Sequence, residues 1–581
     1  MHQRLKQRRA EQMNRNTELH FGNTPQIDLR RSKFEMSHSI KTSFNNGDVI
    51  PIYVDADILP GDTVNMNMAE LIRMATPIYP IMDNLYADIY WFFVPHRLVW
   101  DHWQAFWGEN DDPWTQTTPY EIPQIEAPTG GWTEGTIADY MGIPTKVDDF
   151  SINALPFRAY CKIWNDWFRS EDLKSNCHIY TDETTRTGQN GTEVGYSYVT
   201  GAELGGKPLK VAKFHDYFTS ALPEPQKGDP VGINLTGQLE VNTANTAIRE
   251  VGDTANPLLW GKIDSNGKLQ KLTSNSNLTH LIGDAYNKFG TSMSTNNVYG
   301  ASNLENITPV NLYADLQSVT AMTINQLRTA FAIQKYYENA GLHGTRYIEY
   351  LRGVFGVTSS DARLQRAEYL GGQRVPLNID QIVQTSATDQ VTPQGNTAGF
   401  SCTINKDNMF TKSFEEHGTL MCLVTIRTDH TYQQGLEKMW TRKKWTDFYN
   451  PFFANLGEQA IENRNIYLQG SSAVDADGKE YDTQAFGYQE AWAEYRYKTN
   501  KVTAYMRSNA TGSLDVWHFA DDYSQMPYLS SEWIDEPYTN VDRTIAVTSQ
   551  LTHQFIADFF FKTFYTRPMP VYSVPGLIDH V

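Results

Sequence analysis

Apolar and polar residues alternate with a period of two along much of the first hundred residues. In residues 34–44 the alternate positions hold Phe34, Met36, His38 and Ile40. This pattern is typical of a half-buried strand. Residues 46–48 (Asn-Gly-Asp) supply a turn, and residues 49–54 are predicted to form the partner strand. Residues 62–68 alternate again, and residues 86–94 form a β-rich run that a proline ends. The opening part of the chain is therefore predicted to be strand-led.

Helical periodicity occurs in the connections between these strand-like stretches. Residues 155–170 begin with a proline in the first turn and have one apolar face, made by Phe157, Tyr160, Cys161, Trp164, Trp167 and Phe168. This face is predicted to belong to the core. A second helical pattern covers residues 323–351, with an interruption around residues 341–344, and a short amphipathic stretch covers residues 100–107.

The composition changes between residues 228 and 312. Asn, Gly, Ser and Thr make up 37 of these 85 residues, and seven acidic residues nearly balance five basic ones. The aromatic residues of this stretch are Trp260, Tyr286, Phe289 and Tyr299. A connection of this length in a compact domain is usually functional or a small module of its own, so we expect an insertion.

Further alternating stretches occur at residues 418–432, 491–507 and 544–565. Short strands in both halves without a regular βα alternation favour a β-sandwich or barrel with long loops. The predicted segments are a basic N-terminal arm, a first part of the β domain, the insertion, and a remainder with helical loops and a C-terminal interior segment. They span residues 1–33, 34–227, 228–312 and 313–581.

The charge is unevenly distributed along the chain. The formal net charge is -18, yet residues 1–33 carry eight basic against three acidic residues, which leaves -23 on the rest. A basic arm on an acidic body can neutralise phosphates without reading bases. The predicted nucleic-acid-binding residues of the arm are Arg4, Lys6, Arg8, Arg9, Arg15, Arg30, Arg31 and Lys33. A frayed, solubilising terminus is the alternative.

Aromatic residues and cations also lie together near the C-terminus, where no acidic residue occurs between residues 559 and 572. Bases can stack on such rings while cations follow the phosphates, so Lys562 and Arg567 are further candidates for nucleic-acid binding. Residues 440–445 have a similar composition, with two tryptophans and three basic residues. For both stretches, strand or helix core with cations reaching to solvent is the favoured alternative.

The overall composition excludes several classes of protein. Charged residues make up 20% and aromatic residues 13%, which is incompatible with a disordered or coiled-coil chain. The four cysteines lack the spacing of a zinc site or a disulfide framework, so buried thiols are expected. No apolar run is long enough for a membrane span, and no apolar segment follows the basic N-terminus as in a secretory signal.

Motifs that carry catalytic chemistry are missing. We find no phosphate-binding loop, no dinucleotide fingerprint, no zinc-protease helix and no nucleophile elbow. Residues 475–478 only partly match a calcium loop and are predicted to be a polar turn. Carboxylate pairs could be drawn from Asp55, Asp57, Glu109, Asp111 and Asp112, but the sequence does not select two. No catalytic residue, metal ligand or cofactor is assigned.

Several long segments resemble gokushovirus major capsid proteins, the shell proteins of a group of small bacteriophages in the Microviridae. They are IPIYVDADILPGDTV (residues 50–64), FHDYFTSALPEPQKG (214–228), GTRYIEYLRGVFGVTSSDARLQRAEYLGG (344–372), FYNPFFANLGEQAI (448–461) and FGYQEAWAEYRYKTNKVT (486–503). The resemblance extends from about residue 34 to the C-terminus and is weakest between residues 229 and 310.

The resemblance implies a mainly β fold, a single eight-stranded jelly-roll β-barrel with long inter-strand insertions that contain helices. It also implies a T=1 icosahedral shell of about sixty copies around a circular single-stranded DNA genome, assembled in the host bacterial cytoplasm without membrane insertion. Small internal DNA-binding, scaffolding and pilot proteins and a bacterial surface receptor are the implied partners. The insertion would form three-fold protrusions for host attachment, with Trp260, Tyr286, Phe289 and Tyr299 as receptor candidates.

A jelly-roll carbohydrate-binding or glycan-degrading enzyme is the alternative, since acidic β proteins rich in tryptophan often bind sugars. It would need a carboxylate pair in a cleft.

Overall fold

The computed structural model describes residues 30–109, 120–191, 198–199, 201–229, 231, 324–383, 385, 388, 395 and 397–572, with short strands between residues 241 and 314. Two compact units are present. One contains Met1–Lys227 together with Glu338–Val581, and the other is Gly228–Tyr337.

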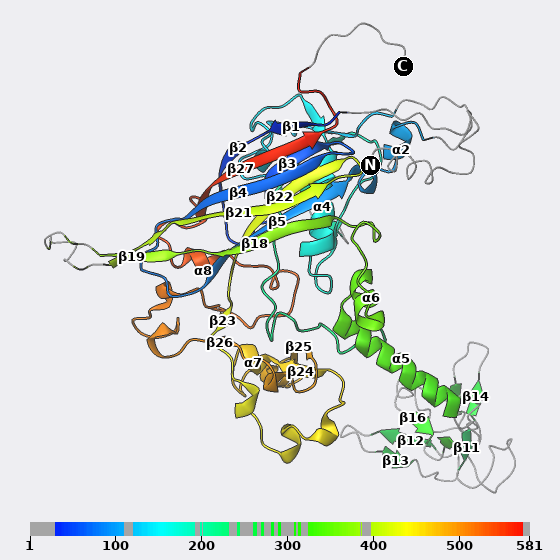
Figure 1. Cartoon of the computed structure of the whole chain (residues 1–581). Helices are drawn as coiled ribbons and strands as arrows, with labels where there is room; N and C mark the ends of the chain where they lie inside the picture. Colours follow the sequence, from blue (N-terminus) through cyan, green and yellow to red (C-terminus); the bar gives the residue numbers. More distant parts are fainter. Residues whose placement is uncertain are drawn as a thin grey trace. The chain divides into compact units, whose positions relative to one another are not determined.

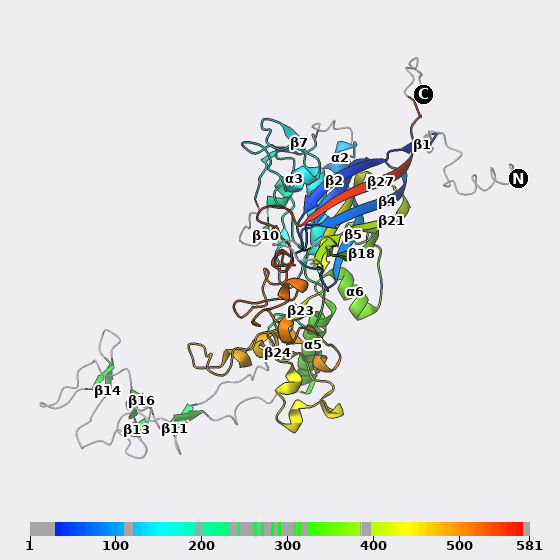
Figure 2. The same ribbon diagram turned by 90° about the vertical axis from the view of Figure 1, so that its left-hand side faces the viewer.

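Two antiparallel sheets form the centre of the larger unit. The first sheet contains β1 (Ser32–Glu35), β2 (His38–Phe44), β27 (Phe555–Arg567), β4 (Thr63–Met74) and β21 (Thr403–Ser413). The second has the order β18 (Glu368–Pro376), β5 (Leu85–Pro95), β22 (Gly418–Thr428) and β3 (Ile50–Ile58). Figure 1 shows the C-terminal strand β27, in red, among the blue N-terminal strands. In Figure 2, β27 lies between β2 and β4, with β21 beyond β4.

The strand order is that of a jelly roll. Leaving β1 aside, the sheets are β2-β27-β4-β21 and β3-β22-β5-β18, so most successive strands along the chain alternate between the two sheets. The four expected strands of the opening third are all present, although residues 36 and 37 separate β1 from β2. The prediction of a mainly β fold of jelly-roll type is thus confirmed.

A layer of apolar side chains fills the space between the sheets. The ring of Trp91 on β5 lies 5.9 Å from that of Phe561 on β27 and 5.4 Å from that of Phe410 on β21. Along β27 every second residue is buried, as expected for a strand that has one face on the core. The alternation seen in the sequence therefore separates core positions from the outer face of this sheet.

The second sheet is covered on its other face as well. Helix α4 (Leu155–Ile163) continues as one π-helical turn over Trp164–Phe168, and its side chains pack with Phe92 on β5 and Leu423 on β22. The Tyr160 hydroxyl donates a hydrogen bond to the Val49 carbonyl at 2.7 Å. The predicted helix over residues 155–170 and its core face are confirmed.

Long connections join the strands. Helix α5 (Ile324–His343) ends at the predicted interruption, where Gly344 has a φ of +88°, and α6 (Tyr347–Phe355) follows. The other elements are α2 (Trp103–Phe106), β6 (Gln124–Glu126), α3 (Ile137–Tyr140), β7 (Ser151–Asn153), β8 (Asn176–Cys177), β9 (Arg186–Thr187), β10 (Tyr198–Val199), β19 (Ile379–Val383), β20 (Thr397–Ser401), β23 (Thr431–Tyr432), β24 (Gln459–Glu462), α7 (Asn463–Ile466), β25 (Ala485–Gln489), β26 (Asn500–Lys501) and α8 (Thr539–Asp542).

The described residues of the smaller unit form two pairs and one triplet of short strands. They are β11 (Val241–Thr243), β12 (Trp260–Ile263), β13 (Leu269–Lys271), β14 (Leu281–Gly283), β15 (Phe289–Thr291), β16 (Ile307–Pro309) and β17 (Leu312–Ala314). β12 pairs with β13 and β16, β11 with β17, and β14 with β15, all antiparallel. The unit begins at the residue where the composition changes.

One expected strand region is wrong, and a second is confirmed only in its latter half. Residues 491–507 contain 3-10 turns at Ala493–Tyr495 and Ala504–Met506 around the two-residue strand β26. In residues 544–565 the strand begins only at Phe555, after a segment of turns and bends. Alternation in residues 491–507 reflects aromatic residues that are only partly covered by neighbouring loops, such as Tyr495 and Tyr497. A half-buried strand is expected to show a period of two, but the same pattern also occurs where no strand forms.

In the part of the chain that the structure describes, no helix is both long and apolar enough to span a bilayer.

Candidate nucleic-acid interface

The two basic ends of the sequence meet in one sheet. Strand β1 pairs antiparallel with the end of β27, and the register places Ser32 opposite Arg567 and Glu35 opposite Phe564. Residues more than 500 positions apart in sequence thereby become neighbours. Tertiary pairing joins the C-terminal aromatic stretch to the end of the basic arm.

Lys33 and Lys562 lie on either side of one aromatic ring. The Lys33 Nζ atom is 4.1 Å from the ring centroid of Phe564, and the Lys562 Nζ atom is 5.6 Å from the same centroid. Both lysines are exposed. A ring flanked by two solvated cations offers a stacking surface for a base and charges for its phosphates.

Arg31 holds the start of β1 to the sheet. Its guanidinium donates to the Gly61 carbonyl and the Thr63 hydroxyl, both at 2.5 Å, and to the Thr566 carbonyl at 3.2 Å. Arg30, the first residue described, is exposed. The other predicted arm residues, Arg4, Lys6, Arg8, Arg9 and Arg15, lie outside the described residues.

Arg567 contacts carboxylates of its own chain. Its Nε atom lies 3.1 Å from the Asp62 Oδ2 atom, and its Nη2 atom donates to the Asp57 carbonyl at 3.0 Å and lies 3.8 Å from the Asp55 Oδ2 atom. These neighbours offset its charge. Among the two C-terminal candidates, Lys562 is therefore better placed to meet a phosphate, and binding by either residue stays a prediction.

The aromatic residues of β27 divide between two environments. Phe559, Phe561 and Tyr565 are fully buried between the sheets, whereas Phe560 is 46% exposed and Phe564 half-buried. The interpretation of this stretch as strand core therefore applies to every second residue of β27. The residues between them, among them Phe560 and Phe564, lie on the outer face of the sheet.

Residues 440–445 are not core. Trp440 and Trp445 are 69% and 72% exposed, and Arg442 pairs with Glu494 at 3.1 Å. The favoured interpretation of this stretch as strand or helix core is wrong, because a short loop with two 3-10 turns carries it across the surface.

Two of the four receptor candidates begin strands of the smaller unit, Trp260 in β12 and Phe289 in β15. Tyr286 and Tyr299 lie outside the described residues. Receptor binding by these four aromatic residues stays a prediction.

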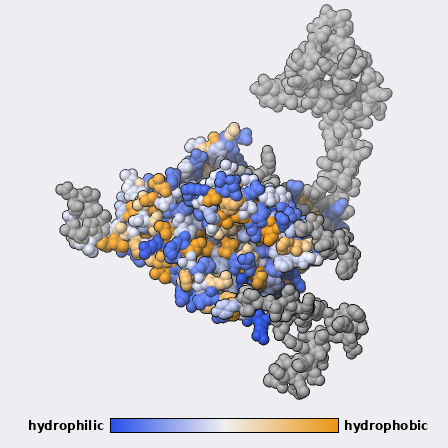
Figure 3. Space-filling model, turned by 90° about the horizontal axis from the view of Figure 1, so that it is seen from above, coloured by the Kyte–Doolittle hydropathy of each residue, from blue (hydrophilic) through white to orange (hydrophobic). Residues whose placement is uncertain are grey.

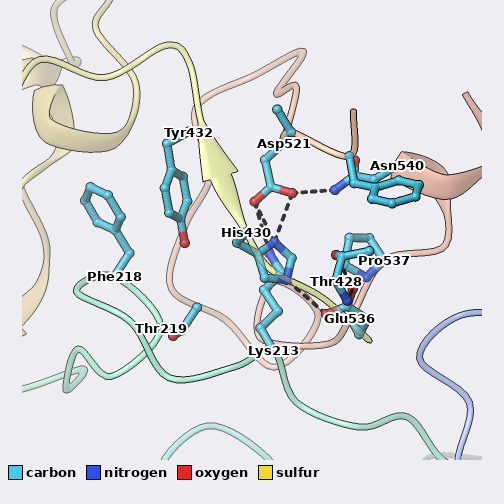
Figure 4. Close-up of polar contacts among 12 residues, drawn as sticks. Lys213, Phe218, Thr219, Thr428, His430, Tyr432, Asp521, Glu536, Pro537 and Asn540 are labelled. Atoms are coloured by element: carbon cyan, nitrogen blue, oxygen red, sulfur yellow. Dashed lines mark hydrogen bonds and ion pairs between the residues drawn. The ribbon is translucent and has the colours of Figure 1, made fainter. Parts of the chain in front are cut away.

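A buried group of charges lies away from this interface and was not foreseen. His430, at the end of the loop after β22, has its Nδ1 atom 3.1 Å from the Asp521 Oδ2 atom and its Nε2 atom 2.9 Å from the Glu536 Oε2 atom. Figure 4 shows the imidazole between the two carboxylates, with Asn540 donating to Asp521. Thr428 donates to Glu536 through both its amide and its hydroxyl. The group joins the end of β22 to the segment that precedes β27.

The charges in this group stabilise one another. Burial by itself lowers the pKa of His430, but the charges of Asp521 and Glu536 outweigh it and raise the pKa to about 10. Burial raises the pKa of Asp521, but His430 and Lys213 hold it well below its usual range. His430 is therefore a cation at neutral pH. Because these contacts tie the end of β22 to two separate loops, we call His430, Asp521 and Glu536 the clasp.

The other candidate chemical groups have structural partners. The Asp475 Oδ1 atom accepts hydrogen bonds from the amides of Asp477 and Lys479, which makes residues 475–478 the predicted polar turn. Asp55 accepts a hydrogen bond from the Tyr565 hydroxyl. Asp111 and Asp112 lie outside the described residues. Within the described residues, no group of three or more histidine, cysteine or acidic side chains is arranged to hold a metal ion.

A jelly roll with long insertions is a fold of viral capsid proteins, and the clustered cations at its paired ends are compatible with that class. Residues 23–577 match the family model described as "Capsid protein (F protein)", and the chain belongs to this family.

Three relatives extend this result over almost the whole chain. The chain is 43% identical over 553 residues to "Capsid protein VP1" of Spiroplasma virus 4, with 94% of this chain and 96% of the relative covered. It is 39% identical over 595 residues to "Capsid protein VP1" of Chlamydia phage 1, covering 96% and 97%. For "Capsid protein VP1" of Bdellovibrio phage phiMH2K the identity is 40% over 567 residues, again covering 96% and 97%. The resemblance to gokushovirus capsid proteins is confirmed, and the chain is a structural protein of a phage virion, not an enzyme.

Proposed function

We propose that this chain closes a T=1 shell of about sixty copies around a circular single-stranded DNA genome. The observation that carries the proposal is the joining of the two basic ends in one sheet, with Lys33 and Lys562 on either side of Phe564. This places exposed cations of a chain with net charge -18 on one surface. The full-length match to capsid proteins supports the self-association.

The basic arm binds the DNA without sequence preference. Its cations outnumber its carboxylates by five, and phosphate neutralisation requires no ordered base contact. Small internal DNA-binding, scaffolding and pilot proteins complete the particle, which assembles in the host cytoplasm.

Sedimentation of native, nuclease-treated particles tests this function. A fast, homogeneous boundary that carries both protein and protected nucleic acid is expected. A slow boundary near 66.2 kDa without nucleic acid would overturn the proposal.

Variants of the arm test its role. Replacing Arg4, Lys6, Arg8 and Arg9 with alanine is expected to lower the DNA content per shell. Lys443→Ala with Lys444→Ala removes exposed cations from another surface and serves as the control. Equal DNA content in wild-type, arm-variant and control particles would contradict a role of the arm in packaging.

The insertion of residues 228–312 forms three-fold protrusions that attach the particle to a bacterial surface receptor. The separate compact unit Gly228–Tyr337 supports this, because a unit with its own contacts can vary without disturbing the jelly roll. Deleting residues 229–310 should leave the jelly roll folded, since the entropy of loop closure depends only weakly on loop length. The same deletion should abolish adsorption to host cells. Loss of soluble protein would show instead that the insertion is needed for folding.

A further inference from the structure

The first sheet has an outer face that points away from the core. On β27 this face carries Phe560, Lys562 and Phe564 at every second position, while Phe559 and Phe561 point to the core. Residues of one strand that are two apart lie about 6.6 Å apart, so the two rings and the cation between them form an extended row. Such a row of rings on an open sheet is how some proteins stack the bases of single-stranded nucleic acid.

Amide side chains lie beside this row. The register places Asn65 opposite Phe564 and Asn67 opposite Lys562, on the neighbouring strand β4. Asn67 donates to the Asn65 Oδ1 atom at 3.0 Å, and Asn408 on β21 donates to the Asn67 Oδ1 atom at 2.9 Å. Each amide has donors and acceptors beyond these bonds, which can meet base edges of any sequence.

The outer face is also positively charged. The registers place five cations on it, of which Lys41 pairs with Asp558 at 3.3 Å. The cations are Lys33, Lys41, Arg73, Lys406 and Lys562, and the acidic residues are Glu35 and Asp558. A cationic face on a chain with net charge -18 is complementary to a polyanion.

We propose that the outer face of this sheet binds the single-stranded genome, with bases stacked on Phe560 and Phe564 and phosphates at Lys33 and Lys562. The inference rests on the proposed function. It adds an ordered platform, which shares only Lys33 with the basic arm, and an orientation, because this face of the subunit must then point to the inside of the shell. The rings alternate with a cation and border amides, which favours nucleic acid over an apolar protein partner.

Ultraviolet crosslinking of genome-filled wild-type particles, followed by mass spectrometry of nuclease-treated peptides, tests the contact directly. Nucleotide adducts are expected on the peptide that contains Phe560 and Phe564. Particles that hold DNA with adducts elsewhere and none on this peptide would overturn the inference and leave the proposed function intact. Particles without DNA would overturn both.

Two matched double variants separate stacking from apolar packing. Phe560→Tyr with Phe564→Tyr keeps both rings, whereas Phe560→Leu with Phe564→Leu keeps apolar side chains and removes the rings. The leucine variant is expected to lose about tenfold in crosslink yield at β27, and the tyrosine variant to match the wild type. Equal yields and DNA content in both variants would overturn the inference in favour of a protein covering this face. If the leucine variant forms no shells, the wild-type crosslinks decide.

Discussion

His430 and Glu536 form a buried ion pair in which the imidazole Nε2 atom lies 2.9 Å from the carboxylate Oε2 atom. The pair connects the end of a jelly-roll strand to the segment that leads into the last strand. Glu536 also accepts hydrogen bonds from Asn46 and Thr428, so it joins the β2–β3 turn to the same point. A single carboxylate thereby couples three parts of the chain.

The clasp predicts that stability falls at alkaline pH. The pKa of His430 is raised to about 10, so the proton that the folded state holds contributes stability fully below pH 6.5, and this contribution is lost as the pH rises through about 10. Denaturant unfolding of the wild type should show this decline. In His430→Gln the decline between pH 6.5 and 10 should disappear. The variant should be about 3–5 kcal/mol less stable at pH 7, because buried Glu536 loses its cation and buried Asp521 keeps only Lys213, at 3.8 Å. Parallel pH curves for the two proteins would show that His430 is neutral.

Substitution at Gly47 should disturb the same point. Gly47 has a φ of +78°, and a Cβ atom there would lie 2.5 Å from the Glu536 carbonyl oxygen. Gly478 has a φ of +77° with nothing within 4 Å of such an atom, which makes it a matched control. Both alanine variants carry left-handed strain of about 1 kcal/mol, and Gly47→Ala should lose clearly more in thermal unfolding. Equal losses would mean that the Glu536 segment moves aside freely.

Helix α6 should become less protected as the pH rises toward neutrality. Burial and the neighbouring Glu171 raise the pKa of Glu349 to about 7, and Arg346 pairs with Glu171 at 2.6 Å. The folded state therefore holds an extra proton between pH 4.5 and 7, and stability falls as the pH rises through this range. Hydrogen exchange of the α6 amides, corrected for intrinsic rates, should show this fall in the wild type. Glu349→Gln should exchange alike at pH 5 and pH 8, and an unchanged pH dependence would assign the effect to another group.

The four thiols should differ in reactivity. Cys161 and Cys177 are buried, with their sulfur atoms 3.1 Å apart, and burial followed by the neighbouring thiol raises the pKa of Cys161. Cys422 is also buried, whereas Cys402 is only partly so. Alkylation of the native protein should modify Cys402 first, and the other three only after unfolding, because the reagent cannot reach a buried thiol. Labelling of Cys161 as fast as Cys402 would mean that helix α4 opens locally.

The sequence by itself determined the local structure of this protein. Alternation in residues 34–44 and 86–94 predicts strands because side chains of a strand point to opposite faces in turn, and the aromatic face of residues 155–170 predicts a core helix. The same reasoning failed at residues 440–445 and 491–507, where exposed aromatic residues imitate core patterns. Local patterns record which residues are apolar, but not what covers them.

Only the tertiary structure decided which distant segments meet. Pairing of β1 with β27 brings Lys33 to Phe564, and the register with β4 sets Asn65 and Asn67 beside the same row. Strand pairing uses backbone hydrogen bonds that every sequence can form, so partners separated by hundreds of residues leave no local signal. The clasp at His430 is likewise assembled from separate loops. The proximity of Asp521 and Glu536, which keeps His430 charged, exists only once the chain has folded.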